Sequence, residues 1–148
     1  MLALAFDVGE LRLALAATCV VEVLHRRELR PLALAPHGVV GLLPFRGSLT
    51  PVVDLCQLLL GRNCAPLRSS RLIVLTLPHR ERPRLIGLLA ENVVDLIDGK
   101  RTMPGLRLPN VPWLGDHLAD QPELPQLVDP LQLLPDELAS LFVEEANG

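Results

Sequence analysis

VVGLLPFRGSLTPVVDL, which runs from residue 39 to residue 55, is the stretch that decides the fold. Two apolar segments, Val39–Leu43 and Leu49–Val53, flank a break at Phe45–Ser48 (FRGS). This pattern predicts a strand, a sharp turn and a second strand, with an Arg-Gly pair that sets a fixed cation beside a position tolerating positive φ. No catalytic nucleophile, general base or set of metal ligands stands beside it. The stretch therefore indicates recognition rather than chemistry.

The composition of the whole chain limits its class. With 148 residues, 49% of them hydrophobic and 21% charged, the chain forms one domain or two small lobes that share an aliphatic core. A net charge of −3 and a pI near 5.8 argue against a general nucleic-acid binder. No apolar run reaches the roughly 18 residues of a membrane helix, and no basic segment precedes an apolar one at the start. We expect a cytoplasmic protein.

The cysteines and histidines predict no metal or cofactor site. Cys19, Cys56 and Cys64 lack CxxC spacing, and we expect them to be buried or partly buried small hydrophobes. The four histidines are spread along the chain at spacings unlike those of zinc sites, at positions His25, His37, His79 and His117.

Around the opening stretch, most of the chain is predicted as short strands separated by turn residues. The expected strands are Leu2–Val8, Leu11–Ala16, Cys19–Leu24, Arg71–Leu77, Leu85–Leu89, Val93–Ile97, Pro112–Leu118 and Leu124–Val128. A short helix is expected over Leu55–Leu60, with Gly61 as its terminator, and a second over Asp136–Val143. Pro130 can open a further helical turn, and Gly99–Pro112 is expected to be irregular. This is an all-β barrel or sandwich with little helix.

The order of these segments resembles the CheW-like family of chemotaxis adaptors. The matching pieces, in chain order, are FDVGELRLAL, CVVEVL, LAPHGVVGLLPFRGSLTPVVDL, RLIVLTL, LIGLLAENVVDLID and LVDPLQLL. The family usually reads Gly-Val-x-Asn-Leu-Arg-Gly at its turn, which corresponds here to Gly41–Gly47, followed by Pro51 and Asp54.

The resemblance implies a fold and an activity. The implied fold is a single domain over residues 1–148, made of two intertwined, five-stranded SH3-like barrels with a shallow apolar groove between them. The implied activity is not catalytic and needs no cofactor. It couples the cytoplasmic tip of a methyl-accepting chemoreceptor to the regulatory domain of a CheA-type histidine kinase, in arrays to which the protein is recruited. Self-association is possible, whereas nucleic-acid binding and membrane insertion are not implied.

The resemblance also assigns roles to residues. The residues that match receptor-facing positions of the family are Val20, Glu22, Val23, Gly41 and Arg46. Those matching kinase or array positions are Arg46, Gly87, Glu91 and Val93. Those matching structural signature positions are Gly47, Pro51 and Asp54.

Three features depart from the family pattern. Pro44-Phe45 replaces the usual Asn-Leu, which removes a backbone donor and enlarges the apolar surface. Glu91 stands where an aspartate is usual, and the first strand starts at residue 2 without the common leader. These departures suggest an auxiliary paralogue that serves a dedicated pathway, such as surface sensing or twitching.

Several residues have simpler interpretations that the sequence leaves open. Arg46 could cap carbonyls of its own turn or pair with Asp54, and Glu22 could be an ordinary solvated strand residue. Because side chains alternate along a strand, at least one of Val20 and Val23 is expected to face the core.

Two other functions have less support in the sequence. A free-standing regulatory β-barrel could bind nucleic acid or another protein through its basic loops, His25–Arg30 and His79–Arg84. Those loops lack aromatic residues for stacking on bases and are expected to be solvated. An enzyme is not expected, since the chain has no defensible Ser-His-Asp pattern, glycine-rich phosphate loop or HExxH motif.

Overall fold

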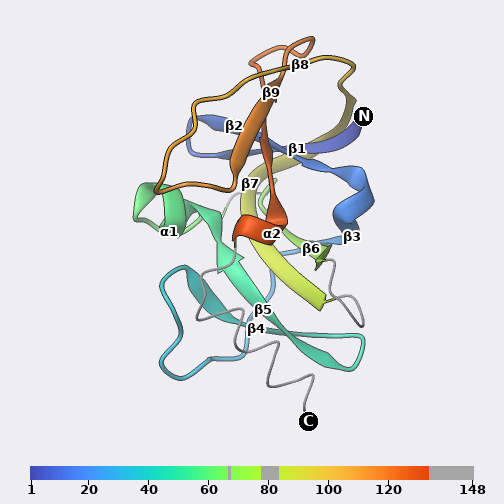
Figure 1. Ribbon diagram of the computed structural model, residues 1–148. Helices are drawn as coiled ribbons and strands as arrows, with labels where there is room; N and C mark the ends of the chain where they lie inside the picture. The colour runs from blue at the N-terminus through green and yellow to red at the C-terminus, as the bar shows by residue number, and fades with distance from the viewer. Residues whose placement is uncertain (67, 78–83, 134–148) are drawn as a thin grey trace.

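The computed structural model describes residues 1–66, 68–77 and 84–133, and strands dominate this part of the chain (Figure 1). The strands are β1 (Leu2–Val8), β2 (Leu11–Ala16), β3 (Val20–His25), β4 (Val39–Phe45), β5 (Ser48–Asp54), β6 (Arg71–Leu77), β7 (Arg84–Asp98), β8 (Thr102–Met103), β9 (Leu114–Leu118) and β10 (Gln126–Val128). The helical segments are the 3₁₀ turn η1 (Ala17–Cys19), α1 (Leu55–Leu60) and α2 (Pro130–Leu133). Strands hold 52% and helices 10% of the described residues, which confirms the mainly β prediction.

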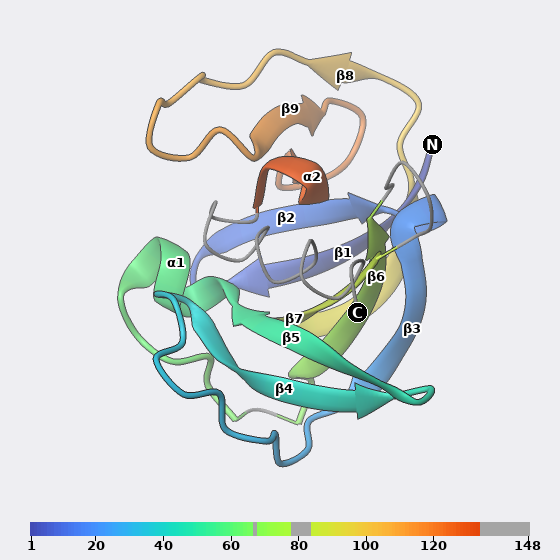
Figure 2. The ribbon, with the colours of Figure 1, turned by 60° about the horizontal axis from the view of Figure 1, so that its bottom comes forward.

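The two halves of the fold share one long strand. In the first sheet the strands lie in the order β3, β6, β7, β5 and β4 (Figure 2). The second sheet consists of β7, β1, β2, β10, β9 and β8, in that order. The fifteen residues of β7 serve both sheets, because its first half pairs with β6 and its second half with β1. The two strands predicted at Leu85–Leu89 and Val93–Ile97 are therefore one. Asn92, with a φ of 45°, lies where the register against β1 shifts, and it bends the strand from one sheet into the other.

The strand β1 separates two apolar clusters, which explains its loosely alternating sequence LALAFDV. Leu4 and Phe6 point into the large core, whereas Ala3 points into a small cluster with Ala14 and Leu118. Both faces are thus buried, and the alternation is between large and small side chains rather than between apolar and polar ones. The hairpin predicted for β1 and β2 forms with the predicted bounds.

The signature stretch folds as the hairpin β4–β5. Phe45 pairs with Ser48, and the two residues between them have positive φ, 48° at Arg46 and 82° at Gly47. Two positive φ values in a two-residue loop define a type I′ turn, whose twist matches that of the flanking strands. The chain then enters α1, which has the predicted bounds and ends at Gly61 with a φ of 69°.

The last third of the described chain is less regular. The strands expected at Pro112–Leu118 and Leu124–Val128 are shortened to β9 and β10, and each begins just after the prolines at positions 112 and 125. The segment expected to be irregular contains only the two-residue strand β8. The helix expected at Asp136–Val143 and the loop at 78–83 lie outside the described residues. None of the helices within the described ranges has the length and apolar character that crossing a bilayer requires.

Candidate interaction surface

An ion pair connects the two outer strands of the first sheet. Glu22 lies on β3, and Arg46 lies at the tip of the β4–β5 hairpin, at the other side of that sheet. The Nη2 atom of Arg46 lies 3.7 Å from Oε2 of Glu22, and their side chains are 66% and 45% exposed. The structure therefore brings together two of the residues predicted to face the receptor. Glu22, rather than Asp54, is the carboxylate beside Arg46.

The side chain of Arg46 is also held by its neighbour in sequence. Its guanidinium carbon lies 4.8 Å from the centroid of the Phe45 ring, a distance typical of cation–π contacts. Phe45 is only 6% exposed, so it anchors the cation from below. The guanidinium thus lies in a defined position on the surface and still offers most of its five N–H donors to a partner.

Exposed apolar side chains also lie on the strands that carry this ion pair. Pro44 and Leu49 are cross-strand neighbours in the hairpin and are both exposed. On β3, Val23 is 39% exposed while Val20 is half-buried against the core. Because the register of β3 shifts between Val20 and Glu22, strict alternation fails there, and Glu22 and Val23 are both exposed. Leu49 was not identified from the sequence, although its place opposite Pro44 in a tight hairpin could have shown it.

Gly41 lies beneath this surface rather than on it. A Cβ at this position would stand 2.7 Å from the carbonyl oxygen of Arg30 and 2.9 Å from Cβ of Leu29. The backbones of Arg30 and Leu42 exchange two hydrogen bonds of 2.8 Å at the same place. The missing side chain of Gly41 therefore lets the connection between β3 and β4 lie against the hairpin.

Two of the residues predicted to bind the kinase or array are also internal. Gly87 is buried between β5 and β6, and an added Cβ would lie 3.0 Å from Cγ2 of Val52. Val93 is 8% exposed and belongs to the large core. Neither presents a side chain to a partner, so a role in assembly would be indirect.

Glu91 is a buried carboxylate that ties three segments together. Its Oε1 accepts from the backbone N–H of Gly9 (3.0 Å), and its Oε2 accepts from the N–H of Ala65 (2.8 Å). Arg62 donates to both oxygens at 3.2 and 3.3 Å. Burial raises the pKa of Glu91, but the Arg62 and backbone hydrogen bonds outweigh it and hold the pKa below its ordinary value. The side chain stabilises the fold where the β1–β2 turn meets β7.

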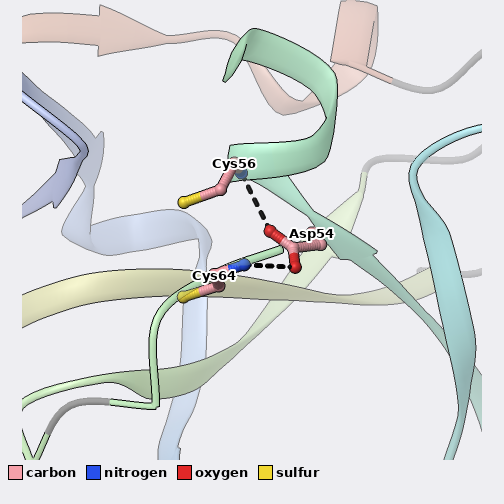
Figure 3. A group of neighbouring side chains, drawn as sticks. All are labelled: Asp54, Cys56 and Cys64. Atoms are coloured by element: carbon pink, nitrogen blue, oxygen red, sulfur yellow. Dashed lines mark hydrogen bonds between the residues drawn. The ribbon is translucent and has the colours of Figure 1, made fainter. Parts of the chain in front are cut away.

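Asp54 has a similar internal role at the start of α1 (Figure 3). One of its oxygens accepts from the N–H of Cys56 at 2.9 Å and of Gln57 at 3.4 Å, and the other from the N–H of Cys64 at 2.8 Å. The residue is 1% exposed. Asp54 is therefore both an N-cap and a clamp on the chain that follows the helix. Pro51 lies on β5, and Gly47 lies in the turn before it.

The thiols of Cys56 and Cys64 lie beside this carboxylate, and the ligand atoms of the three side chains are all within 4.8 Å of one another. Burial, followed by the nearby negative charges, raises the pKa of Cys56 to about 12 and also raises that of Cys64. Metal binding needs thiolates, and both Asp54 oxygens already accept backbone hydrogen bonds. The two thiols therefore stay protonated, and the group forms a buried cap at the start of α1. As predicted, the two cysteines are small core residues.

Comparison with known proteins gives the family. A family model for the CheW-like domain matches residues 2–111. Among solved structures, the scaffolding protein TtCheW from Thermoanaerobacter tengcongensis is similar, with a TM-score of 0.74 and 17% identity over 87% of this chain and 84% of that one. The comparison with curated proteins gave no match. The likeness to TtCheW confirms the predicted fold with two SH3-like lobes. The match of the family model over most of the chain shows that the protein belongs to the CheW-like domain family.

Proposed function

We propose that this protein is a non-catalytic adaptor that couples the cytoplasmic tips of methyl-accepting chemoreceptors to a CheA-type histidine kinase. It would act in the cytoplasm, in arrays formed on membrane-bound receptors. Membership of the CheW-like family supports a scaffold role in chemosensory signalling. The observation that carries the proposal for this chain is the exposed Arg46, stacked on Phe45 and paired with Glu22.

The chemistry of that surface suits a helical receptor tip. An amphipathic helix presents apolar anchors every third or fourth residue, with charged residues beside them. Val23 and Leu49 offer exposed apolar surface, and Arg46 offers a planar set of donors that can bind a carboxylate in two places. An exposed ion pair contributes only about 0–1 kcal/mol, so Arg46 can exchange Glu22 for a partner's carboxylate at little cost.

The kinase contact is proposed for the region around residues 87–93. Gly87, Glu91 and Val93 are internal, so they would act by shaping the backbone of β7 and the segments that Glu91 holds. Arg46 would serve the receptor, the array, or both. Such contacts are individually weak, and assembly would come from many of them together.

The sequence at the hairpin supports a dedicated pathway. Pro44 is exposed on β4 and cannot donate a backbone hydrogen bond, while Phe45 supplies the ring on which Arg46 lies. Both differ from the usual residues of the family. We propose that they adapt this adaptor to its own receptor.

The test is a pull-down with immobilised purified protein and an extract of the bacterium that encodes it. Wild type, Arg46→Glu and the control Arg101→Glu are compared. Arg101 is exposed just before β8, away from the hairpin in sequence, and its substitution changes the charge by the same amount. We expect wild type and control to retain a chemoreceptor and a histidine kinase, and Arg46→Glu to lose at least one of them. Recovery of neither by wild type would overturn the adaptor function, whereas unchanged recovery by Arg46→Glu would overturn only the role of Arg46.

A further inference from the structure

A hollow of about 520 Å³ lies between α1 and the connection from β3 to β4. Figure 2 shows these two segments at the same side of the molecule. Its wall combines two arginines, two amides and apolar side chains, chiefly Arg26, Arg27, Gln57, Asn63, Val39 and Leu89. The volume falls within the roughly 300–1,000 Å³ that ligand sites occupy in proteins. Leu89 and Asn63 of its wall lie in the region proposed for the kinase contact, but the adaptor role assigns no ligand to the hollow.

The hollow is held open by contacts at both ends of the connection. Nη1 of Arg26 donates to the carbonyl oxygen of Cys64 at 3.0 Å, and Arg30 pairs with the backbone of β4. At the other end, the N–H of Asp54 donates to the carbonyl oxygen of Gly38 at 2.8 Å. The hollow lies between these points. Because these contacts already hold the connection in place, ligand binding should cost little conformational entropy of the loop.

The charge in the hollow is positive. Arg27 is exposed at the wall, and within the described ranges it has no hydrogen bond or ion pair. Arg26 has donors beyond the one used by Cys64. The one carboxylate of the wall belongs to Asp54, whose two oxygens already accept three backbone N–H groups. An incoming anion would meet two cations and a carboxylate that backbone dipoles have largely compensated.

The amide and apolar side chains of the hollow indicate which groups the ligand has besides its negative charge. Gln57 donates to Asn63 at 2.6 Å, which fixes the two amides beside the arginines. Val39 and Leu89 are 7% and 4% exposed and form the apolar floor. We propose that this hollow binds an organic carboxylate with a short apolar body, either as a free acid or as an acidic side chain flanked by an apolar one. The inference is independent of the proposed adaptor function.

The proposal is tested by titrating ¹⁵N-labelled protein and following its backbone amide signals. The probes are hexanoate and hexanamide, which differ in charge but hardly in shape. We expect hexanoate to shift the signals of Val40, Gln57 and Asn63 in a saturable way and to bind about tenfold or more tightly than hexanamide. A charge-assisted hydrogen bond is strong enough to produce a difference of that size. Equal affinity for the two probes, or no saturable shift at these residues, would overturn the proposal.

Two variants of equal charge change locate the site. Arg27→Glu should weaken hexanoate binding about tenfold or more, whereas Lys100→Glu, exposed near the second sheet, should leave it unchanged. Equal effects of both would mean that only the net charge matters, and the site would be wrong. Unperturbed signals outside the hollow would show that Arg27→Glu keeps the fold.

A second set of probes identifies the source of the carboxylate. The capped peptide Ac-Leu-Glu-Leu-amide is compared with Ac-Leu-Gln-Leu-amide and with hexanoate. Tighter binding of the glutamate peptide than of hexanoate would support an acidic segment of a partner protein. The reverse order would support a free short-chain acid. If the glutamate peptide and hexanoate both fail to bind at these residues, the hollow is not a carboxylate site.

Discussion

Arg46 and Glu22 lie 3.7 Å apart and join the hairpin tip to β3, the two outer parts of the first sheet. Both side chains remain largely exposed, so the pair holds a cation at the surface without burying it. A partner that approaches this face meets an arginine already positioned by Phe45 and a carboxylate that can be displaced. Substitutions at these two residues should therefore change the binding of a partner with little change in the free energy of unfolding.

The ion pair should contribute little to folding. In a double-mutant cycle with Glu22→Gln and Arg46→Gln, we expect a coupling of about 0.2–1 kcal/mol in the free energy of unfolding, declining with added salt. Urea unfolding of the four proteins measures it. A coupling above about 2 kcal/mol would mean that the pair is part of the structural framework, and the exchange with a partner's carboxylate would then be untenable.

Glu91 should matter far more to stability than an exposed acid does. Glu91→Gln leaves a buried N–H without its charged acceptor and removes the ion pair with Arg62, so we expect a loss of about 2–3 kcal/mol. Asp98→Asn should cost less than about 0.5 kcal/mol, because this side chain is 62% exposed and, among the described residues, pairs only with the amino group of Met1. Similar urea midpoints for the two variants would contradict the role of Glu91.

Glu91 should also make the free energy of unfolding depend on pH. The pKa of Glu91 is lower in the folded protein than the ordinary glutamate value of 4.5, so the unfolded state binds the proton more readily. The stabilisation is present above that value and is lost as pH falls through the lower folded-state pKa. The difference in unfolding free energy between wild type and Glu91→Gln should therefore narrow toward acid. A gap that stays constant down to strongly acidic pH would show that Glu91 titrates normally.

Gly41 and Gly47 should respond differently to the same substitution. Gly41→Ala drives a methyl group into the Arg30 backbone, so we expect a loss of more than about 2 kcal/mol. Gly47→Ala meets no atom within 4 Å and bears only the strain of a φ of 82°, about 1 kcal/mol. Thermal or urea unfolding compares them. If Gly41→Ala is as stable as wild type, Gly41 is free to act directly at the receptor surface.

The buried thiols should resist alkylation. With a pKa of about 12, Cys56 has on the order of a thousandfold less thiolate at mildly alkaline pH than an ordinary cysteine. We expect iodoacetamide to label Cys56 and Cys64 only after unfolding. Mass spectrometry of native and denatured samples measures the labelling. Rapid labelling of either residue in the native protein would show that the cap around Asp54 opens readily.

Local sequence determined much of this fold. The bounds of β1, β2, β6 and α1 agree with prediction because each is set by its own apolar pattern and by an adjacent turn or cap. Arg46-Gly47 specifies the tight hairpin in the same local way, since the loop must accept two positive φ values. The end of α1 at Gly61 is local too, because glycine takes the left-handed conformation readily.

The tertiary structure decided which of those residues meet. Nothing local shows that Arg46 pairs with Glu22 rather than with Asp54, because that depends on how five strands are ordered in a sheet. The continuity of β7 is also a tertiary result, since a strand shared by two sheets bends at Asn92 only because both have partners for it. The tertiary structure also decided that Glu91 is an internal residue rather than a surface contact. A buried carboxylate is stable only where donors surround it, and here the backbone N–H groups of distant segments bind Glu91.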